Sequence, residues 1–300
     1  NQSGYSQAAQ DYILALHRSN KYNIKIVPID HKPNKTVISE DRWSIFSKMI
    51  DTELESPFIQ ILHCIPTIQK RIAKTQKTIG FATFETFQPP KNWIDILNSN
   101  TAMVAPSLFN YKIFAHEKIK KPIFYFPHCL DMGLYNKNVE PLLKYDKFTF
   151  LFMGTWKTRK GYPQLIEAWL NEFTEKDNVQ LVIKTDKIQQ AQQYVEKSKK
   201  KQGNRGFAPV FFEDKLFDEK TLPRFMKSFN CLIEPTLGEG FCLPGLQSMA
   251  LGVPVVITDF SGCQDYANEK TSTLLEPEGF ILHNNMDAIP QFANKKWAFL

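Results

Sequence analysis

Residues 234–257 read EPTLGEGFCLPGLQSMALGVPVVI, and this stretch decides the fold. The apolar runs 231–233 and 253–257 are typical of buried parallel strands, because strands covered on both faces are apolar throughout. Between these runs, Pro244 suits the first turn of a helix and Gly252 suits the residue just after its end. The sequence therefore predicts a strand, a glycine-rich turn, a short helix and a second strand.

The glycine-rich turn before this helix is a candidate anion site. Residues 238–243 bring several backbone N–H groups to a helix N-terminus, where the helix dipole also favours negative charge. Glu239 lies inside the turn, and a carboxylate there repels an anion. We therefore expect Glu239 to face a neutral part of the same ligand, such as a sugar hydroxyl next to a diphosphate. The alternative is an ordinary turn whose glycines only shape the backbone.

A second loop of the same kind follows the apolar run 148–153. It reads GTWKTRKG over residues 154–161, and a helix is predicted from Tyr162 to about Phe173. Arg159 and Lys160 add fixed positive charge to this loop. The spacing differs from the GxxxxGK[ST] and GxGxxG patterns, which disfavours a P-loop ATPase and a dinucleotide-binding loop. Two such loops occur in one domain in which strands and helices alternate. This favours phosphate binding over the alternative that Arg159 and Lys160 are ordinary solvent-exposed surface residues.

Strands and helices alternate along the rest of the chain. The other predicted strands are 24–29, 58–62, 78–84, 102–105, 123–126, 179–183 and 210–212, and the other predicted helices lie near 9–16, 89–98, 106–110, 188–201 and 219–228. This order predicts an α/β fold with doubly wound parallel sheets. Three hundred residues favour two domains, which we place at 1–145 and 146–300. The chain starts at Asn1, without an initiator Met, and we expect its natural first strand to be missing.

The segment from Glu239 to Val255 resembles the hallmark EGFGLPxLEAMAxGxPV of the retaining group 1 glycosyltransferases (family four). Here it reads EGFCLPGLQSMALGVPV. The resemblance implies the GT-B fold, in which two Rossmann-like domains face a cleft, with the acceptor bound by the first and the nucleotide sugar by the second. Glu239 matches the glutamate that contacts the donor sugar. Two positions depart from the pattern: Gln247 replaces the glutamate that holds the ribose, and Cys242 replaces the middle glycine.

The resemblance also assigns a donor site to the later half. The loop with Arg159 and Lys160 resembles the phosphate loop of the family, whose Arg and Lys bind the donor diphosphate. Near the start, Gly4 matches a glycine in the loop before the first helix. The donor-binding candidates are Gly4, Gly154, Arg159, Lys160, Glu239, Gly240, Phe241, Cys242, Leu243 and Gln247.

Three residues of the earlier half are further candidates. His63 follows the predicted strand 58–62, at the end of a strand where open α/β sheets bind ligands, and the resemblance places it in the donor or acceptor cleft. His63 joins Arg159, Lys160 and Glu239 as a candidate catalytic residue. Glu85 and His128 are candidates for contact with the acceptor. The alternatives are a structural histidine at 63, a capping or surface carboxylate at 85 and a hinge residue at 128.

Charge is unevenly distributed along the chain. Residues 1–145 hold 18 Lys and Arg against 12 Asp and Glu, a net charge of +6, whereas residues 146–300 hold 19 of each. A positive half attracts an anionic partner such as nucleic acid or a membrane surface, although a solvated lysine-rich surface explains it equally well. No apolar run reaches the about 20 residues that a membrane-spanning helix needs.

The five cysteines, at positions 64, 129, 231, 242 and 263, form no CxxC pair. Their odd number and scattered spacing argue against a disulfide framework and against a zinc site, and favour a reducing compartment. We therefore expect a cytoplasmic protein, and the positive half would also suit a peripheral position at a membrane.

These observations predict a retaining glycosyltransferase that moves a sugar from a nucleotide diphosphate sugar to an unidentified acceptor, such as a glycan, a lipid-linked sugar or a modified nucleic-acid base. Fixed cations and backbone N–H groups would stabilise the departing diphosphate, so we expect neither a metal nor a cofactor. The resemblance implies that the leaving phosphate accepts the proton of the acceptor. Gln247 and Cys242 leave open a GT-B scaffold that binds without turnover, and a nucleotide-sugar epimerase is the other alternative.

Overall fold

The computed structural model describes residues 4–29, 38–69, 77–203, 205–288 and 292–300. The chain divides into two compact units, and each is made of separate segments. The first unit comprises Asn1–Thr83, Lys91–Leu134 and Leu216–Leu222, and the second comprises Phe84–Pro90, Tyr135–Lys215 and Pro223–Leu300. Because each unit has its own sheet, each is described by itself.

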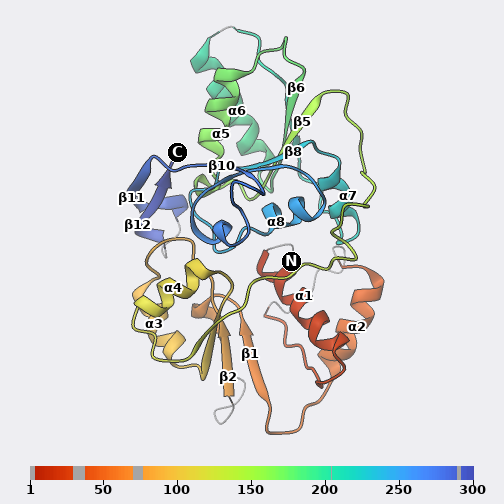
Figure 1. Ribbon diagram of the computed structural model, residues 1–300, viewed down its shortest axis with the longest axis vertical. Coiled ribbons are helices and arrows are strands. Elements are labelled where there is room, and N and C mark those ends of the chain that lie inside the picture. Colours follow the sequence, from red (N-terminus) through yellow and green to blue (C-terminus); the bar gives the residue numbers. More distant parts are fainter. Residues whose placement is uncertain (1–3, 30–37, 70–76, 204, 289–291) are drawn as a thin grey trace. The chain divides into compact units, whose positions relative to one another are not determined.

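The first unit contains a parallel four-stranded sheet in the order β1-β2-β3-β4. Strands β1 and β2 are labelled in Figure 1. Its elements are α1 (Gly4–Arg18), α2 (Glu40–Asp51), β1 (Ile59–His63), the 3-10 turn η2 (Pro66–Ile68), β2 (Lys77–Phe81), α3 (Lys91–Asn98), β3 (Ala102–Ala105), α4 (Leu108–His116) and β4 (Ile123–Tyr125). Strand β3 has the predicted bounds, and Ser107 caps α4 by accepting a hydrogen bond from the Asn110 N–H. The predicted parallel α/β arrangement is confirmed in this unit.

The strand predicted at residues 24–29 is wrong, because residues 21–28 form neither helix nor strand. Ile24 and Ile26 instead pack against a small core formed by α1 and α2, and the Ile26 N–H donates to the Met49 carbonyl oxygen at 3.0 Å. The alternation of isoleucines that suggested a strand therefore reflects one side of an extended segment buried against helices. Helix α2 was not predicted, although Ser39 caps its N-terminus.

The second unit contains a parallel six-stranded sheet in the order β10-β9-β8-β5-β6-β7. Its elements are β5 (Phe148–Met153), η3 (Thr158–Lys160), α5 (Tyr162–Glu172), β6 (Val179–Lys184), α6 (Ile188–Gln202), β7 (Val210–Glu213), α7 (Thr221–Lys227), β8 (Cys231–Glu234), α8 (Leu243–Ala250), β9 (Val255–Thr258), η4 (Ser261–Asp265), β10 (Thr273–Leu275), β11 (Gly279–Asn285), η5 (Met286–Ala288) and β12 (Ala293–Phe299). Helix α7 starts within a segment of the first unit and continues into the second. The strand order reverses between β5 and β8, as in a doubly wound sheet.

Apolar side chains from β5, β6, α5 and α6 form the main core of this unit. Phe152, Leu170, Leu181 and Ile183 are each fully buried there. These are the elements that the sequence predicts best, because their strands are apolar and their helices have a regular buried face.

The antiparallel pair β11 and β12, in blue in Figure 1, was not predicted. Among the described residues, no helix is both long enough and apolar enough to cross a membrane.

Candidate functional site

The two loops singled out in the sequence meet at the point where the strand order reverses. Strands β5 and β8 are neighbours, and the loop after β5 lies against the turn after β8. The Leu237 N–H donates to the Arg159 carbonyl oxygen at 2.8 Å. Gly161 has a φ of 75°, and a Cβ there would lie 1.7 Å from the Pro235 carbonyl oxygen. Only glycine therefore permits this close contact, at the edge of the sheet where open α/β folds bind ligands.

A buried ion cluster fills the space between the two loops. One carboxylate oxygen of Glu239 lies 2.6 Å from Lys160 Nζ and 3.1 Å from Arg159 Nη1, and it accepts a hydrogen bond from Thr236 Oγ1 at 3.2 Å. Lys160 and Glu239 are only 9% and 7% exposed. Burial alone would raise the pKa of Glu239, but Lys160 and Arg159 outweigh it and lower that pKa. Glu239 and Lys160 therefore both stay charged in the interior of the second unit.

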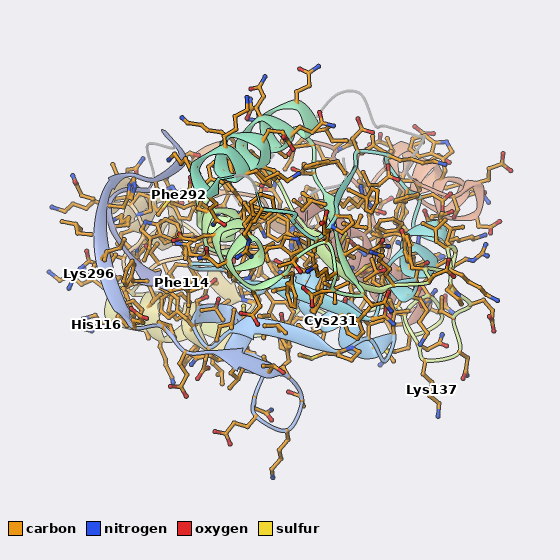
Figure 2. All side chains as sticks on the ribbon, turned by 90° about the horizontal axis from the view of Figure 1, so that it is seen from above. Phe114, His116, Lys137, Cys231, Phe292 and Lys296 are labelled. Carbon is orange, nitrogen blue, oxygen red and sulfur yellow. The ribbon has the colours of Figure 1, made fainter. Side chains whose placement is uncertain are left out.

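Glu85 supplies a second carboxylate to Arg159, at 3.7 Å from Nη2. Burial raises the pKa of Glu85 despite this cation. Its segment, residues 84–90, belongs to the second unit, and a Cβ on Gly238 would lie 2.4 Å from the Glu85 carbonyl oxygen. The Phe292 ring, labelled in Figure 2, lies 5.9 Å from the Arg159 guanidinium carbon. Arg159 is thus held between two carboxylates and an aromatic ring.

Two backbone N–H groups of the basic loop already have an acidic partner. The carboxylate of Asp287, in η5, accepts hydrogen bonds from the Thr158 and Arg159 N–H groups. Asp287 has a φ of 57°, which a residue with a side chain rarely adopts. An anion that binds at this loop therefore meets the side chains of Arg159 and Lys160 rather than these two amides.

The turn before α8 offers the other expected anion contact. Cys242 is the N-cap of α8 and has a φ of 65°, the left-handed conformation that glycine adopts most easily. Pro244 stands in the first turn of α8, as predicted. Further along the helix, Gln247 is 2% exposed, and its Nε2 donates to the Tyr135 hydroxyl at 3.2 Å. The amide of Gln247 is therefore oriented by Tyr135.

Residues 147–294 match the sequence profile of the family described as "Glycosyl transferases group 1". This segment is a group 1 glycosyltransferase domain. It contains both loops, the ion cluster and α8. Among curated proteins, none matches the sequence of the chain.

Solved structures share the fold at low sequence identity. The chain aligns with OtsA in its apo form at a TM-score of 0.59 and 12% identity, over 79% of this chain and 64% of OtsA. It aligns with an α,α-trehalose-phosphate synthase from Burkholderia xenovorans at 0.57 and 10%, over 78% and 67%. It aligns with HepE of Anabaena at 0.54 and 12%, over 68% and 59%. The chain thus spans less than two thirds of the OtsA and HepE chains, and it has the predicted GT-B fold.

Outside the glycosyltransferase domain, the histidine candidates lie together in the first unit. His63 ends β1, and its ring lies 5.0 Å from the Phe81 ring and 6.2 Å from the His128 ring. The Tyr12 hydroxyl is 3.0 Å from His128 Nδ1. Burial lowers the pKa of His63 to about 4 and that of His128 to about 3. Both imidazoles are therefore neutral at pH 7. Gly4, the third candidate of this unit, is the first residue of α1.

Within the glycosyltransferase domain, sequence reasoning missed Glu234, the last residue of β8. It is fully buried, and neither carboxylate oxygen has a hydrogen-bond partner among the described residues. Burial raises the pKa of Glu234 well above its usual value. A carboxylate at the end of an otherwise apolar strand was a visible signal. The roles of Tyr135 and Asp287 had no such signal, because their partners lie far away in the sequence.

Proposed function

We propose that this chain is a retaining glycosyltransferase that transfers a sugar from a nucleotide diphosphate sugar. The observation that carries the proposal is the pairing of Arg159 and Lys160 with Glu239 at the edge of the sheet between β5 and β8. Two cations held beside a helix N-terminus suit a diphosphate. The carboxylate between them suits a sugar hydroxyl next to that diphosphate.

The chemical demand on this site is the negative charge that builds up on the departing diphosphate. Arg159, Lys160 and the N–H groups of residues 240–243 would stabilise that charge, as an oxyanion site does. Because both cations are already fixed by Glu239, little reorganisation is needed when the donor enters. In this mechanism the leaving phosphate takes the proton of the attacking hydroxyl, and the anomeric configuration is retained. Arg159 and Lys160 then stabilise the charge of the leaving diphosphate, a role that a bound metal ion has in other enzymes.

The nucleotide part of the proposal draws on Gln247 and on the solved structures. A structure of the E. coli trehalose-6-phosphate protein carries UDP-2-fluoro glucose, and HepE of Anabaena carries UDP and glucose. We therefore take UDP-sugars as the first donors to test. The Gln247 amide oxygen would accept a hydrogen bond from a ribose hydroxyl, with Tyr135 holding the amide in place.

For the acceptor we propose a negatively charged molecule. The net charge of +6 over residues 1–145 supports an anionic acceptor, such as a nucleic acid or a lipid-linked sugar at a membrane surface. The scattered cysteines support a cytoplasmic location. Measuring the KM for the acceptor at increasing salt distinguishes an anionic from a neutral acceptor. Salt screens the attraction between the positive half and an anionic acceptor and so raises that KM, whereas the KM for a neutral acceptor should stay unchanged.

Lys160→Ala tests the proposed function. We expect transfer from UDP-sugars to fall by a factor of about 100 to 1,000, because one stabilising contact to the leaving group is lost. Lys157→Ala is the matched control, since Lys157 lies in the same loop outside the ion cluster, and it should leave transfer within about twofold. Full activity of Lys160→Ala with its true donor would show that the phosphate-loop assignment is wrong.

A further inference from the structure

Behind the turn that contains Glu239, two buried cysteines lie against each other. Cys242 is the N-cap of α8 and Cys263 lies in η4; they are 5% and 0% exposed. Both are free thiols, and Cys263 is hydrogen-bonded to Cys242. Neither residue belongs to a CxxC motif, so the sequence alone gave no reason to pair them.

The backbone segments that carry these cysteines are already joined. The Glu239 N–H donates to Ser261 Oγ at 2.8 Å, and the Gly262 N–H donates to the Glu239 carbonyl oxygen at 2.9 Å. A Cβ on Gly262 would lie only 2.1 Å from the Gly240 carbonyl oxygen. The residues next to the two cysteines are therefore held in direct contact, which keeps Cys242 and Cys263 on neighbouring segments, as a disulfide requires.

The two thiols differ in their readiness to ionise. The hydrogen bond from Cys263 lowers the pKa of Cys242 and outweighs burial and the Glu239 carboxylate, which raise it; the positive charge of Lys160 adds to the lowering. The same hydrogen bond raises the pKa of Cys263. A helix N-terminus and a neighbouring lysine are the surroundings in which cysteines become reactive thiolates. By contrast, burial raises the pKa of Cys64 and of Cys231 to about 11.

We propose that Cys242 and Cys263 are an oxidisable dithiol in the wall of the donor turn, which a peroxide converts into an intramolecular disulfide. The Cys242 thiolate attacks one peroxide oxygen and becomes a sulfenic acid, as the O–O bond breaks and the other oxygen leaves as water after protonation. The sulfur of Cys263 then attacks the sulfenic sulfur, losing its proton, and a second water leaves. The two thiols lose two electrons and two protons in total, and hydrogen peroxide is reduced to two waters.

The chemistry of this site does not depend on sugar transfer. Its effect on the donor does rest on the proposed function, because Cys242 stands in the turn whose N–H groups would face the diphosphate. A disulfide replaces the thiol hydrogen bond with a shorter covalent link and shifts this turn. We therefore expect oxidation to lower donor binding and reduction by dithiothreitol to restore it.

The decisive experiment treats the folded chain with hydrogen peroxide, blocks the remaining thiols and maps the peptides by mass spectrometry. Trypsin leaves three of the cysteines in one peptide, residues 228–270, so a protease that cleaves after Glu and Asp must be added. Cleavage after Glu234 or Glu239 and after Asp259 then separates Cys231, Cys242 and Cys263. We expect a linked peptide pair that contains Cys242 and Cys263, a loss of two hydrogens from the chain, and full reversal by dithiothreitol.

Three variants make the result specific. Cys242→Gly suits the positive φ at this position and should fold, but it should give no linked peptide. Cys263→Ser should stop at the sulfenic acid of Cys242, which a dimedone probe detects. Cys129→Ser removes the exposed cysteine and should leave the link unchanged. A link that forms only in denaturant, or peroxide that oxidises Cys129 while Cys242 and Cys263 stay reduced, would overturn the proposal whatever the transfer assay shows.

Discussion

The two units bury ionisable groups in opposite ways. In the second unit, Lys160 and Glu239 are both buried and both charged, because each lies within 2.6 Å of its partner. In the first unit, His63 and His128 are surrounded by aromatic rings, and burial keeps both imidazoles neutral. Lys160 and Glu239 stay charged because they form an ion pair, whereas His63 and His128 stay neutral because burial lowers their pKa.

This difference supports the proposal that a diphosphate binds to the second unit. The two cations are already fixed in position by their carboxylate partner. The free-energy cost of desolvating them is part of folding, so it does not weaken the binding of an anionic ligand. The neutral cluster around His63 offers ring faces and a neutral hydrogen-bonding group instead, which suit an uncharged ligand surface better than a phosphate. Three substitutions test whether this contrast is real.

The largest effect is expected from Glu239→Gln. Removing the carboxylate leaves Lys160 and Arg159 buried without their shared partner, and breaking a buried pair costs about 3–5 kcal/mol. The free energy of unfolding from urea titration should fall by about that amount. Glu196→Gln is the control, because it breaks the 2.9 Å pair with Lys199 on the exposed side of α6 and should cost less than about 1 kcal/mol. Equal losses in the two variants would contradict the contrast.

A medium effect is expected from acid acting on His63. Because its pKa falls to about 4 on folding, the unfolded chain takes up a proton below pH 6.5 that the folded chain refuses. His63 therefore destabilises the fold progressively as the pH falls from about 6.5 to 4, by roughly 2–3 kcal/mol. His63→Phe should make the slope in a series of urea titrations shallower, and the slope that remains includes a contribution from His128, whose pKa is also lowered by burial, to about 3. Substitution of the exposed His17 by Gln should leave the slope unchanged. Parallel slopes for wild type and His63→Phe would show that this imidazole is not held neutral.

The smallest effect, with the opposite sign, is expected from Glu234. Its pKa is raised on folding, so its contribution to stability is full below about pH 4.5 and is lost as the pH rises through the folded value. At pH 5, Glu234→Gln should lie within about 1 kcal/mol of wild type, since both side chains are neutral and buried. Towards pH 8 the variant should become the more stable chain. Exposed Glu276→Gln is the control, and a gap that stays constant with pH would mean that Glu234 does not titrate in this range.

The strands and loops of the second unit could be predicted because their signals are local. The apolar run of β5 and the glycines of the two loops determine their structure from neighbouring residues alone. The same holds for Ser107, which caps α4. The sequence also indicated that Arg159, Lys160 and Glu239 belong to one site, because two phosphate-binding loops recur in one alternating α/β domain.

Long-range partners account for what the sequence could not provide. Glu239 was expected to face a neutral group of a ligand, and without a ligand it lies against two cations. Gln247 is held by Tyr135, which is 112 residues away, and the amides of Thr158 and Arg159 are held by Asp287. Ile24 and Ile26 alternate with polar residues as in a strand, yet they pack against helices. In each case, tertiary packing determined an outcome that local patterns left open.

The segmented make-up of the units limits how such a protein can be rearranged. The chain passes from one unit to the other five times, after Thr83, Pro90, Leu134, Lys215 and Leu222. A cut after Leu134 would leave residues 84–90 on the wrong fragment, including Glu85, and would leave residues 216–222 without the unit in which they pack. Recombination with a relative at a single junction would therefore give hybrids with a piece missing from each part. Functional hybrids require the two short segments to be exchanged together with the unit to which each belongs.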